Sequence, residues 1–443
     1  MTTFVQVHMK AQSPVWCSVC PVYARTCSYP ATLTIAVQFP CQWLNDNAVN
    51  MGGDATRITI FGESAGAVSV GYHLMSPLSM HLFSYAILMS ASPTAYWGIQ
   101  DTEIARNRTQ TLACLLGCRA RDMAETIDYL RTVSAQLITE RQFNFTKFYF
   151  DTPFAPVVDG HFLPKHPTDL MAEGKVKNTS IISGVVKDEG TYWLLYGFSN
   201  IYDKLDTSPM SYSQFAKVVS DILRPLGPRF GTDLIQELTI KEYYDSVPPW
   251  SRSYLDATDD ISGDTLFKCP VVNFSELYSN KVKGHVYMYS FEHRVSTNSW
   301  PQWLGVAHGY EIEMFFGLPL GENNYTRQER ALSDDVMARI ANFAYTGNPN
   351  HGTKTVAVGW TEYTSHDQHY LVISADSTRV SQGLRYSQCQ FWSSQVPLVL
   401  QADHTVAPLL FVTRLCEFVV SFHPSPMIHT HTHTHSHTHI HTI

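Results

Sequence analysis

The stretch Arg57-Ile-Thr-Ile-Phe-Gly-Glu-Ser-Ala-Gly, which ends at Gly66, decides how this sequence folds. The β-branched and aromatic run from Ile58 to Phe61 predicts a buried strand. Residues Ala67 to Met75 have helical character, and Ser76-Pro77 ends them. A Gly-x-Ser-x-Gly motif between a strand and a helix predicts a sharp turn, in which the two glycines leave room for Ser64 to present its hydroxyl. This context favours a nucleophilic serine over a chance match in a loop.

A serine nucleophile needs a base, and the base needs an acid that orients it. In proteins with this strand-turn-helix motif the acid and then the histidine follow the serine along the chain. The best candidate acid is Glu189, which follows the apolar run Ile181 to Val186. The best candidate base is His308, which follows the short run Leu304 to Ala307. The chain holds 20 His, so spacing alone leaves a core or surface histidine open as the alternative.

Five separated segments share the order and approximate spacing of one family. They are Gln42-Trp-Leu-Asn-Asp-Asn, Phe61-Gly-Glu-Ser-Ala-Gly-Ala-Val-Ser-Val-Gly, Lys187-Asp-Glu-Gly-Thr-Tyr-Trp-Leu-Leu-Tyr-Gly, Trp303-Leu-Gly-Val-Ala-His-Gly-Tyr-Glu-Ile-Glu and Thr346-Gly-Asn-Pro-Asn. Together they resemble the cholinesterase branch of the type-B carboxylesterases. The resemblance implies an α/β-hydrolase fold that acts on choline esters, with Ser64 as nucleophile, His308 as general base and acid, and Glu189 as the orienting carboxylate.

The chemistry of these residue types fits ester hydrolysis. His308 would take the Ser64 proton as the hydroxyl oxygen attacks the ester carbonyl, and the Ala65 backbone N–H would donate to the oxyanion. An acyl-enzyme would form, choline would leave, and water activated by His308 would complete the turnover. Glu63 resembles the family's buried carboxylate beside the choline head group. A turn residue that faces solvent remains the alternative reading of Glu63.

A second set of matches concerns recognition of the substrate. The quaternary ammonium of choline cannot donate hydrogen bonds, so proteins hold it against aromatic faces by cation–π attraction. The resemblance assigns Tyr192, Trp300 and Tyr310 to the choline site and its gorge, and Trp97, Phe150 and Trp193 to the acyl pocket. Aromatic residues make up 12% of the chain. Plain core packing therefore stays open as an alternative for each of the six.

The residues before Ser64 are the main departure from the family pattern. In this fold several strands, and a glycine-rich loop that supplies further oxyanion donors, precede the nucleophile. Gly52-Gly53 is the only Gly-Gly pair upstream of Ser64, and residues 1–40 hold no match to the tryptophan that floors the family's choline site. We therefore expect an α/β-hydrolase fold that is incomplete at the N-terminal side of its sheet, in a chain that lacks the family's N-terminal part. Loss of one oxyanion donor costs about 10²–10³ in rate, so we also expect impaired hydrolysis.

These matches divide the chain into three parts. Residues 41–400 form one partial catalytic domain, and the 44% hydrophobic content of the chain is enough for a sizeable core. Residues 1–40 are an unmatched segment and a candidate for disorder. Residues 401–443 are a tail outside the family pattern, in which His and Thr alternate from Ile428 onward. This alternation cannot build a core, and we favour translated non-coding sequence as its origin.

Charge and composition restrict the partners. The net charge of −8 argues against a nucleic-acid partner. Cys17-x-x-Cys20 with Cys27 lacks the second pair that would complete a metal site, and nothing in the sequence indicates a cofactor. The expected partner is a small choline ester. A homodimer, and membrane or synaptic anchoring that this sequence does not encode, are open properties of the family.

The cysteines and glycosylation motifs favour an oxidising compartment. The chain has nine Cys, and the resemblance implies a disulfide between Cys269 and Cys389. It also places Tyr129 where the family's partner of Cys118 belongs, so we expect free thiols there. Five N-x-[ST] motifs occur, at Asn107, Asn144, Asn178, Asn273 and Asn324. A secreted or cell-surface protein is therefore expected, although residues 1–16 show no signal peptide.

Two other functions stay open. A general carboxylesterase would keep the same chemistry and act on other esters. A cholinesterase-like adhesion protein would keep the fold without catalysis, and the presence of Ser64, Glu189 and His308 argues against it.

Overall fold

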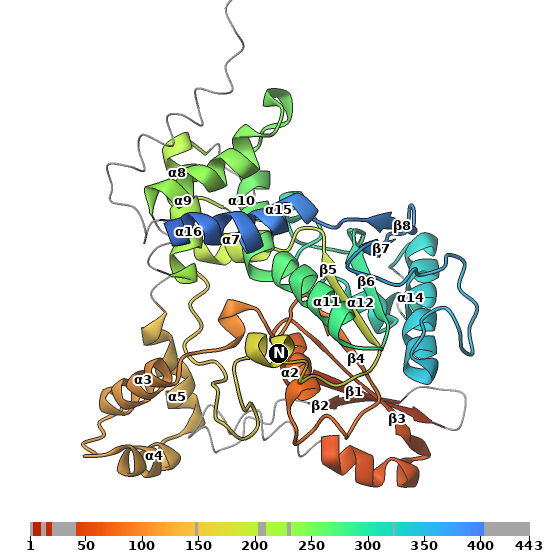
Figure 1. Ribbon diagram of the computed structural model, residues 1–443, viewed down its shortest axis with the longest axis horizontal. Helices are drawn as coiled ribbons and strands as arrows, with labels where there is room; N and C mark the ends of the chain where they lie inside the picture. The colour runs from red at the N-terminus through yellow and green to blue at the C-terminus, as the bar shows by residue number, and fades with distance from the viewer. Residues whose placement is uncertain are drawn as a thin grey trace, which may run out of the picture. The chain divides into compact units, whose positions relative to one another are not determined.

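The protein is described here from a computed structural model, whose arrangement of helices and strands Figure 1 shows. The structure describes residues 3–9, 15–19, 41–146, 149–202, 210–227, 232–321 and 324–402. The chain divides into two compact units, Met1–Ser393 and Ser394–Ile443. The first unit holds the sheet and every candidate site residue that lies in the described ranges. In the second unit the described part consists of the end of a π-helical turn and the helix α16 (Val396–Ala402).

A sheet of eight strands forms the centre of the first unit, in the order β2-β1-β3-β4-β5-β6-β7-β8. Strands β3 to β7 run parallel to one another, and β1, β2 and β8 are antiparallel to their neighbours. The strands are β1 Thr3–Met9, β2 Val15–Val19, β3 Gly53–Glu63, β4 Tyr85–Met89, β5 Ile181–Val186, β6 Val286–Phe291, β7 His369–Ile373 and β8 Arg379–Gln382. Because all residues of β5 and β6 are buried, these strands read as continuous apolar runs, as central parallel strands do.

The N-terminal edge of the sheet differs from the expectation for residues 1–40. That segment indicated no strand, yet β1 pairs with β3 in antiparallel register from Thr3 opposite Gly62 to Val7 opposite Ile58, and β2 pairs with β1. The edge of β3 offers a row of backbone N–H and C=O groups that any nearby extended segment can pair with. Two antiparallel strands therefore extend the sheet at the edge where residues 1–40 had indicated no strand.

Helices pack around the sheet. They are α2 Ala65–Met75, α3 Thr102–Leu115, α4 Met123–Thr132, α5 Ala135–Gln142, α6 Pro167–Ala172, α7 Thr191–Gly197, α8 Tyr212–Leu223, α9 Asp233–Ile240, α10 Tyr254–Gly263, α11 Cys269–Lys281, α12 Ile312–Phe315, α13 Leu318–Gly321, α14 Arg327–Thr346 and α15 Tyr386–Gln390. Short 3₁₀ and π turns join several of them, including the π turn Asp264–Lys268 between α10 and α11.

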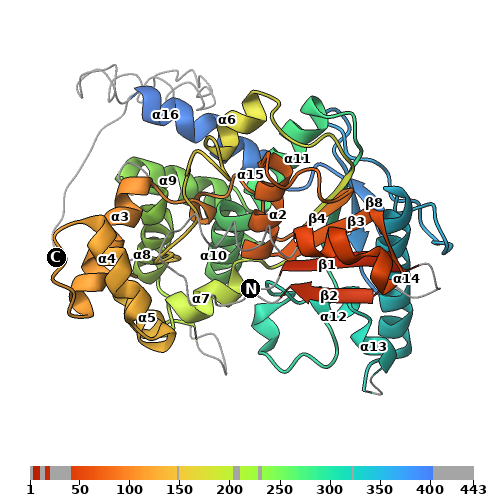
Figure 2. The same ribbon diagram turned by 90° about the horizontal axis from the view of Figure 1, so that it is seen from below.

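Two layers of helices cover the two faces of the sheet (Figure 2). On one face, strand residues such as Phe61, Ile182 and Tyr289 form a buried cluster with residues of α12 and α14, for example Met314 and Phe343. On the other face α2 packs on β3 and β4, and α11 packs on β5 and β6. Burial of both faces by helices is the usual arrangement of a parallel sheet in α/β proteins. The predicted α/β class is therefore confirmed.

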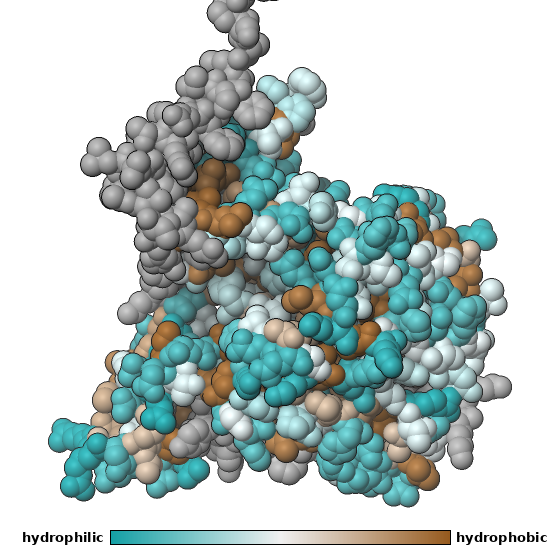
Figure 3. Space-filling view, viewed as in Figure 1, coloured by the Kyte–Doolittle hydropathy of each residue, from teal (hydrophilic) through white to brown (hydrophobic). Residues whose placement is uncertain are grey.

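The surface in the view of Figure 3 is mostly hydrophilic, and hydrophobic residues lie on it singly or in small groups. Scattered exposed apolar side chains are normal for a folded protein. In the part of the chain that the structure describes, no helix combines the length and apolar character needed to cross a membrane.

Candidate active site

Ser64 occupies a strained turn between β3 and α2. Its backbone has φ 59° and ψ −124°, a conformation that residues other than glycine rarely adopt. The turn is so tight that a Cβ atom on Gly62 would lie 2.3 Å from the carbonyl carbon of Gly66. The Ser64 N–H donates to the Met89 carbonyl oxygen at 2.8 Å, which ties the turn to the end of β4. The first glycine of the Gly-x-Ser-x-Gly motif is therefore a steric requirement of this turn.

Helix α2 begins directly after this serine. Ala65 is its first residue, so the Ala65 N–H is one of the four N–H groups at a helix start that have no partner within the helix. The partial positive charge of a helix N-terminus favours negative charge at this position. An oxyanion that forms at an ester bound to Ser64 would meet such an N–H donor.

The acid and the histidine come together from loops that follow two different strands. Glu189 follows β5 and is fully buried. Its Oε1 accepts a hydrogen bond from the Val186 N–H at 2.9 Å, and its Oε2 lies 2.5 Å from Nδ1 of His308. This second contact holds the plane of the imidazole ring and places a proton on Nδ1. The structure thus brings together two residues that are far apart in the sequence.

The other ring nitrogen of His308 faces Glu63, the residue before the candidate nucleophile. The His308 Nε2 atom lies 3.1 Å from Glu63 Oε1, without the geometry of a hydrogen bond, and neither atom has another hydrogen-bond partner. The chain neighbour of Ser64 thus contacts the ring, and the Ser64 hydroxyl is not hydrogen-bonded to Nε2. Hydrogen bonds of catalytic groups are often long or badly aligned before the substrate is bound.

A third buried carboxylate lies beside this group, and sequence reasoning missed it. Glu311 is fully buried, and its Oε1 accepts from the Ser90 hydroxyl at 3.3 Å and from the Tyr289 hydroxyl at 3.4 Å. Burial, together with the negative charges of Glu63 and Glu189, raises the pKa of Glu311 to about 8. The available signal was the position of this glutamate three residues after His308, within a segment that already matched the family.

The carboxylates govern the proton affinity of the histidine. Burial by itself lowers the pKa of His308, but the charges of Glu63 and then Glu189 outweigh this effect and raise the pKa to about 9. Burial also raises the pKa of Glu63. The protonation of the ring therefore depends on the protonation of the carboxylates. When Glu63 is neutral, the pKa of His308 is lower and the ring loses its proton at lower pH.

Two aromatic rings contact the histidine, and two more pack against them. The ring centroids of Trp193 and Phe267 lie 5.5 Å and 4.3 Å from that of His308. Phe150 contacts Trp193 edge-on at 4.5 Å, and Trp97 contacts Phe150 at 5.5 Å. The three residues predicted for the acyl pocket thus form one group with the ring. Phe267 was not predicted, because it lies in the π turn before α11 and outside every matched segment.

The predicted choline-site aromatics form a second, neighbouring group. Tyr192, Trp300 and Tyr310 pack with Trp303 against the buried residues Leu195, Leu304 and Ala307. The centroids of Tyr192 and Trp300 lie 6.3 Å apart, and Tyr192 contacts Trp193 edge-on at 5.0 Å. The two aromatic groups are therefore continuous through the first turn of α7.

The predicted disulfide between Cys269 and Cys389 is present and closes a loop with a sequence separation of 120 residues. Among the described cysteines Cys41, Cys114 and Cys118 are free. Tyr129 packs beside Cys118 and donates its hydroxyl to the Leu116 carbonyl oxygen at 2.6 Å, so it fills the place of the family's second cysteine. Cys20, Cys27 and the tail from residue 403 onward lie outside the described residues.

The candidate glycosylation sites differ in their surroundings. Asn107, Asn144 and Asn324 are exposed. Asn178 is exposed too, but its side-chain oxygen accepts from the Lys283 and Gly284 N–H groups. Asn273 is half-buried in α11, and Ser275 of its motif is fully buried. A glycan acceptor normally lies in a surface loop, so the Asn273 position is the least suitable of the five.

The sheet, the strained serine turn and the following acid and histidine loops define an α/β-hydrolase. The chain belongs to the Carboxylesterase family, whose model matches residues 37–392. Two proteins similar to this chain belong to a narrower group within such esterases. The cholinesterase of Mus musculus is 40% identical over 368 residues, and the acetylcholinesterase of Bungarus fasciatus is 37% identical over 369 residues. Each alignment covers 82% of this chain, which spans 60% of the length of either relative.

Proposed function

We propose that this chain is a serine esterase that hydrolyses choline esters through an acyl-enzyme, with Ser64 as nucleophile, His308 as general base and acid, and Glu189 as the orienting carboxylate. The observation that carries the proposal is the contact of 2.5 Å between Glu189 Oε2 and His308 Nδ1, next to a strained serine turn. The similarity to a cholinesterase and an acetylcholinesterase supports the choice of substrate class.

The reaction follows from these positions. Nε2 of His308 takes the Ser64 proton while the hydroxyl oxygen attacks the ester carbonyl, and the Ala65 N–H donates to the negative oxygen of the tetrahedral intermediate. The imidazolium returns the proton to the departing choline oxygen. Water then attacks the acyl-serine with the same assistance, and Glu189 holds the ring in one tautomer through both steps.

Recognition of the alcohol part rests on aromatic faces and buried negative charge. Tyr192, Trp300 and Tyr310 present a continuous aromatic group that suits a quaternary ammonium. Glu63 directly precedes Ser64 in the sequence and lies 3.1 Å from His308 Nε2, where its carboxylate can attract the same cation. The group of Trp97, Phe150 and Trp193 is placed to contact the acyl chain of the ester.

We further propose that the polypeptide of these 443 residues hydrolyses its substrate slowly. Within this sequence Ser64 is preceded by no second glycine-rich loop, so the Ala65 N–H is the oxyanion donor that can be assigned. One missing donor lowers the rate by about 10²–10³. The disulfide indicates folding in an oxidising compartment, which fits secretion or display at the cell surface, and a homodimer there agrees with the family resemblance.

Hydrolysis of acetylthiocholine by the full chain tests the proposal, with Ser64→Ala as the matched control. We expect slow turnover that the Ser64→Ala variant lacks, and covalent labelling of the wild-type chain, but not of the variant, by a fluorophosphonate probe. Equal labelling and equal turnover in both proteins would refute the catalytic assignment. Comparison with the uncharged 3,3-dimethylbutyl ester distinguishes a cholinesterase from a general carboxylesterase. Equal kcat/KM for both esters would favour a general carboxylesterase.

A further inference from the structure

The loop that carries Glu189 is fixed at each of three consecutive residues. Asp188 Oδ2 accepts from the Val306 N–H at 2.6 Å, and the Asp188 N–H donates to the Val306 carbonyl oxygen at 3.1 Å. Glu189 contacts His308 as described above. The Gly190 N–H donates to Asp259 Oδ1 at 2.8 Å. The acid loop is thus held between the histidine loop on one side and helix α10 on the other.

Asp188 pairs with the histidine loop as a short piece of parallel sheet. It forms an isolated bridge with Ala307, the residue before His308. Thr191 reinforces this pairing, because its hydroxyl reaches the carbonyl oxygens of both Asp188 (3.1 Å) and Leu304 (2.9 Å). The backbone on both sides of the Glu189–His308 contact is therefore held in one register.

The contact between Asp188 and the histidine loop requires a residue without a side chain at position 305, which is Gly305. Its φ is +57°, and a Cβ atom at this position would lie 2.1 Å from Asp188 Oδ2 and 2.7 Å from Asp188 Cγ. The carboxylate of Asp188 thus lies directly against the backbone of the turn that leads to His308. A side chain at position 305 would displace the carboxylate or the loop.

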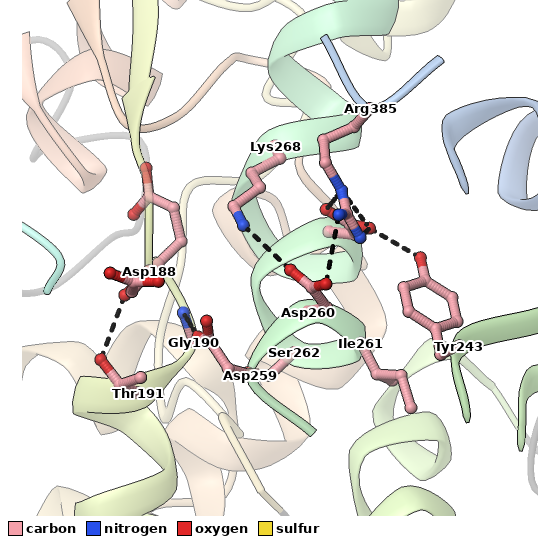
Figure 4. Close-up of polar contacts among 12 residues, drawn as sticks. Asp188, Gly190, Thr191, Tyr243, Asp259, Asp260, Ile261, Ser262, Lys268 and Arg385 are labelled. Carbon is pink, nitrogen blue, oxygen red and sulfur yellow. Dashed lines mark hydrogen bonds and ion pairs between the residues drawn. The ribbon is translucent and has the colours of Figure 1, made fainter. Parts of the chain in front are cut away.

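A buried charge cluster supports the other side of the acid loop (Figure 4). A Cβ atom on Gly190 would lie 2.4 Å from the Asp259 carbonyl oxygen, so the loop packs directly on α10. Next to Asp259, Asp260 pairs with Lys268 Nζ at 3.4 Å and with Arg385 Nη1 at 3.1 Å. Asp259 and Lys268 are buried. The side chain of Asp260 is 35% exposed, so its ion pairs are only partly buried, and the direct packing of Gly190 on α10 is the stronger restraint on the loop.

We propose that Asp188 is a positioning residue that sets the distance between Glu189 and His308 by accepting the Val306 N–H. This inference rests on the proposed function, because it assigns a role to those two residues. The contact joins two loops that are separated by more than a hundred residues of chain, and it lies one residue from the acid and two residues from the histidine. Reacting groups must be held within fractions of an ångström, so loss of this acceptor should lower kcat and leave KM unchanged.

The experiment compares Asp188→Ala, Asp188→Asn and Lys187→Ala in the full chain. Asp188→Ala removes the acceptor, and we expect kcat for acetylthiocholine to fall by about tenfold to a hundredfold at unchanged KM. Asp188→Asn keeps an amide oxygen for the Val306 N–H, and we expect it to restore most of the lost kcat. Lys187→Ala changes the exposed neighbour and serves as the matched control. Wild-type kcat in Asp188→Ala, or equal losses in Asp188→Ala and Asp188→Asn, would overturn the proposal.

A readout that needs no turnover separates this inference from the proposed function. The low-field proton resonance of His308 Nδ1–H should be present in the wild type and in Asp188→Asn, and lost or moved to higher field in Asp188→Ala. If the wild type and Ser64→Ala are equally inactive, the proposed function fails, while this resonance still decides the role of Asp188. An unchanged resonance in folded Asp188→Ala would refute that role.

A double-mutant cycle with Gly305→Ala tests the contact itself. In the wild-type background the added methyl group meets the Asp188 carboxylate, and we expect kcat to fall as it does in Asp188→Ala. In the Asp188→Ala background the carboxylate is gone, so the second substitution should cost less, and the cost that remains is the backbone strain of alanine at φ +57°. Fully additive effects on kcat would show that the two residues act independently and would contradict the proposal.

Discussion

His308 Nε2 lies 3.1 Å from Glu63 Oε1, while the opposite nitrogen of the same ring lies 2.5 Å from Glu189 Oε2. The imidazole is thus placed between two carboxylates, and Glu311 adds a third nearby. Such an arrangement would stabilise the imidazolium that forms in the proposed reaction. The same carboxylates raise the pKa of His308, so the neutral ring that can act as a base forms at higher pH than in an isolated histidine.

The first prediction concerns the pH dependence of the rate. Glu63 raises the pKa of His308 more than any other charge does. The neutral Glu63→Gln variant should therefore lower the pKa of His308 from its value of about 9, and the free base should form at lower pH. We expect the midpoint of the acid limb of the kcat/KM profile to move to lower pH by about one unit or more.

Glu313→Gln is the control for this profile, because Glu313 accepts a hydrogen bond from Tyr325 and is not among the causes of the shift at His308. The control should keep the wild-type midpoint. A shift of the Glu63→Gln midpoint to higher pH would contradict the electrostatic account.

A second prediction tests the serine turn. Gly62→Ala would place a Cβ atom 2.3 Å from the Gly66 carbonyl carbon, so strand β3 and helix α2 must move apart. We expect loss of turnover together with a destabilisation of about 1–3 kcal/mol, typical of overpacking. Gly359→Ala is the matched control, because no heavy atom lies within 4 Å of the added Cβ atom. Thermal unfolding and acetylthiocholine assays should separate the two variants, and wild-type behaviour of Gly62→Ala would disprove the steric argument.

The part of the site that sequence reasoning predicted is the local part. The serine turn depends on residues within one strand, one turn and one helix, so the motif from Arg57 to Gly66 is enough to predict it. The strands β5 and β6 are equally local, because a short apolar run buried on both faces has few other places to lie. Glu189 and His308 were proposed from their position after apolar runs and, among 20 His, from the resemblance, and the structure brings the two side chains into contact.

The missed features depend on contacts between distant segments. Glu311, Phe267 and Asp188 become part of the site because distant segments meet there. For Glu311 the segment around His308 held a signal, but its burial beside Ser90 and Tyr289 depends on contacts between segments. Strand β1 is a similar case, because its pairing partner β3 lies more than forty residues away in the sequence and offers an open edge. Long-range contacts of this kind decide burial, which raises the pKa values of Glu63 and Glu311, and they bring together the carboxylates whose charges raise the pKa of His308.

A third prediction concerns the disulfide. Cys269 begins α11 and Cys389 lies in α15, and their bond closes a loop with a sequence separation of 120 residues. A loop of this length restricts the unfolded chain by about 5 kcal/mol in the chain-entropy model. We expect Cys389→Ser to lower the free energy of unfolding by about 2–5 kcal/mol, measured by urea denaturation. Cys114→Ser, at an exposed free cysteine, should leave the midpoint unchanged, and equal midpoints for all three proteins would show that the bond adds no stability.

The last prediction uses the start of helix α14, where Glu329 anchors the segment after β6. Its carboxylate accepts from the Ser296 N–H and hydroxyl at 2.5 Å and 2.7 Å, and from the Thr326 N–H at 2.7 Å in a capping box. Burial alone raises the pKa of Glu329, but the bonds from Ser296 and Thr326 outweigh it and lower the pKa to about 2. A carboxylate whose folded pKa is depressed stabilises the fold above its unfolded pKa of 4.5 and loses that contribution as the pH falls toward 2.

Glu329→Ala should therefore cost about 3 kcal/mol at neutral pH, whereas Glu237→Ala, at an exposed position of α9, should cost almost nothing. In urea unfolding the difference between the wild type and Glu329→Ala should shrink steadily from pH 5 to pH 3, and a difference that stays constant or grows would show that the ionised carboxylate is not what holds this segment.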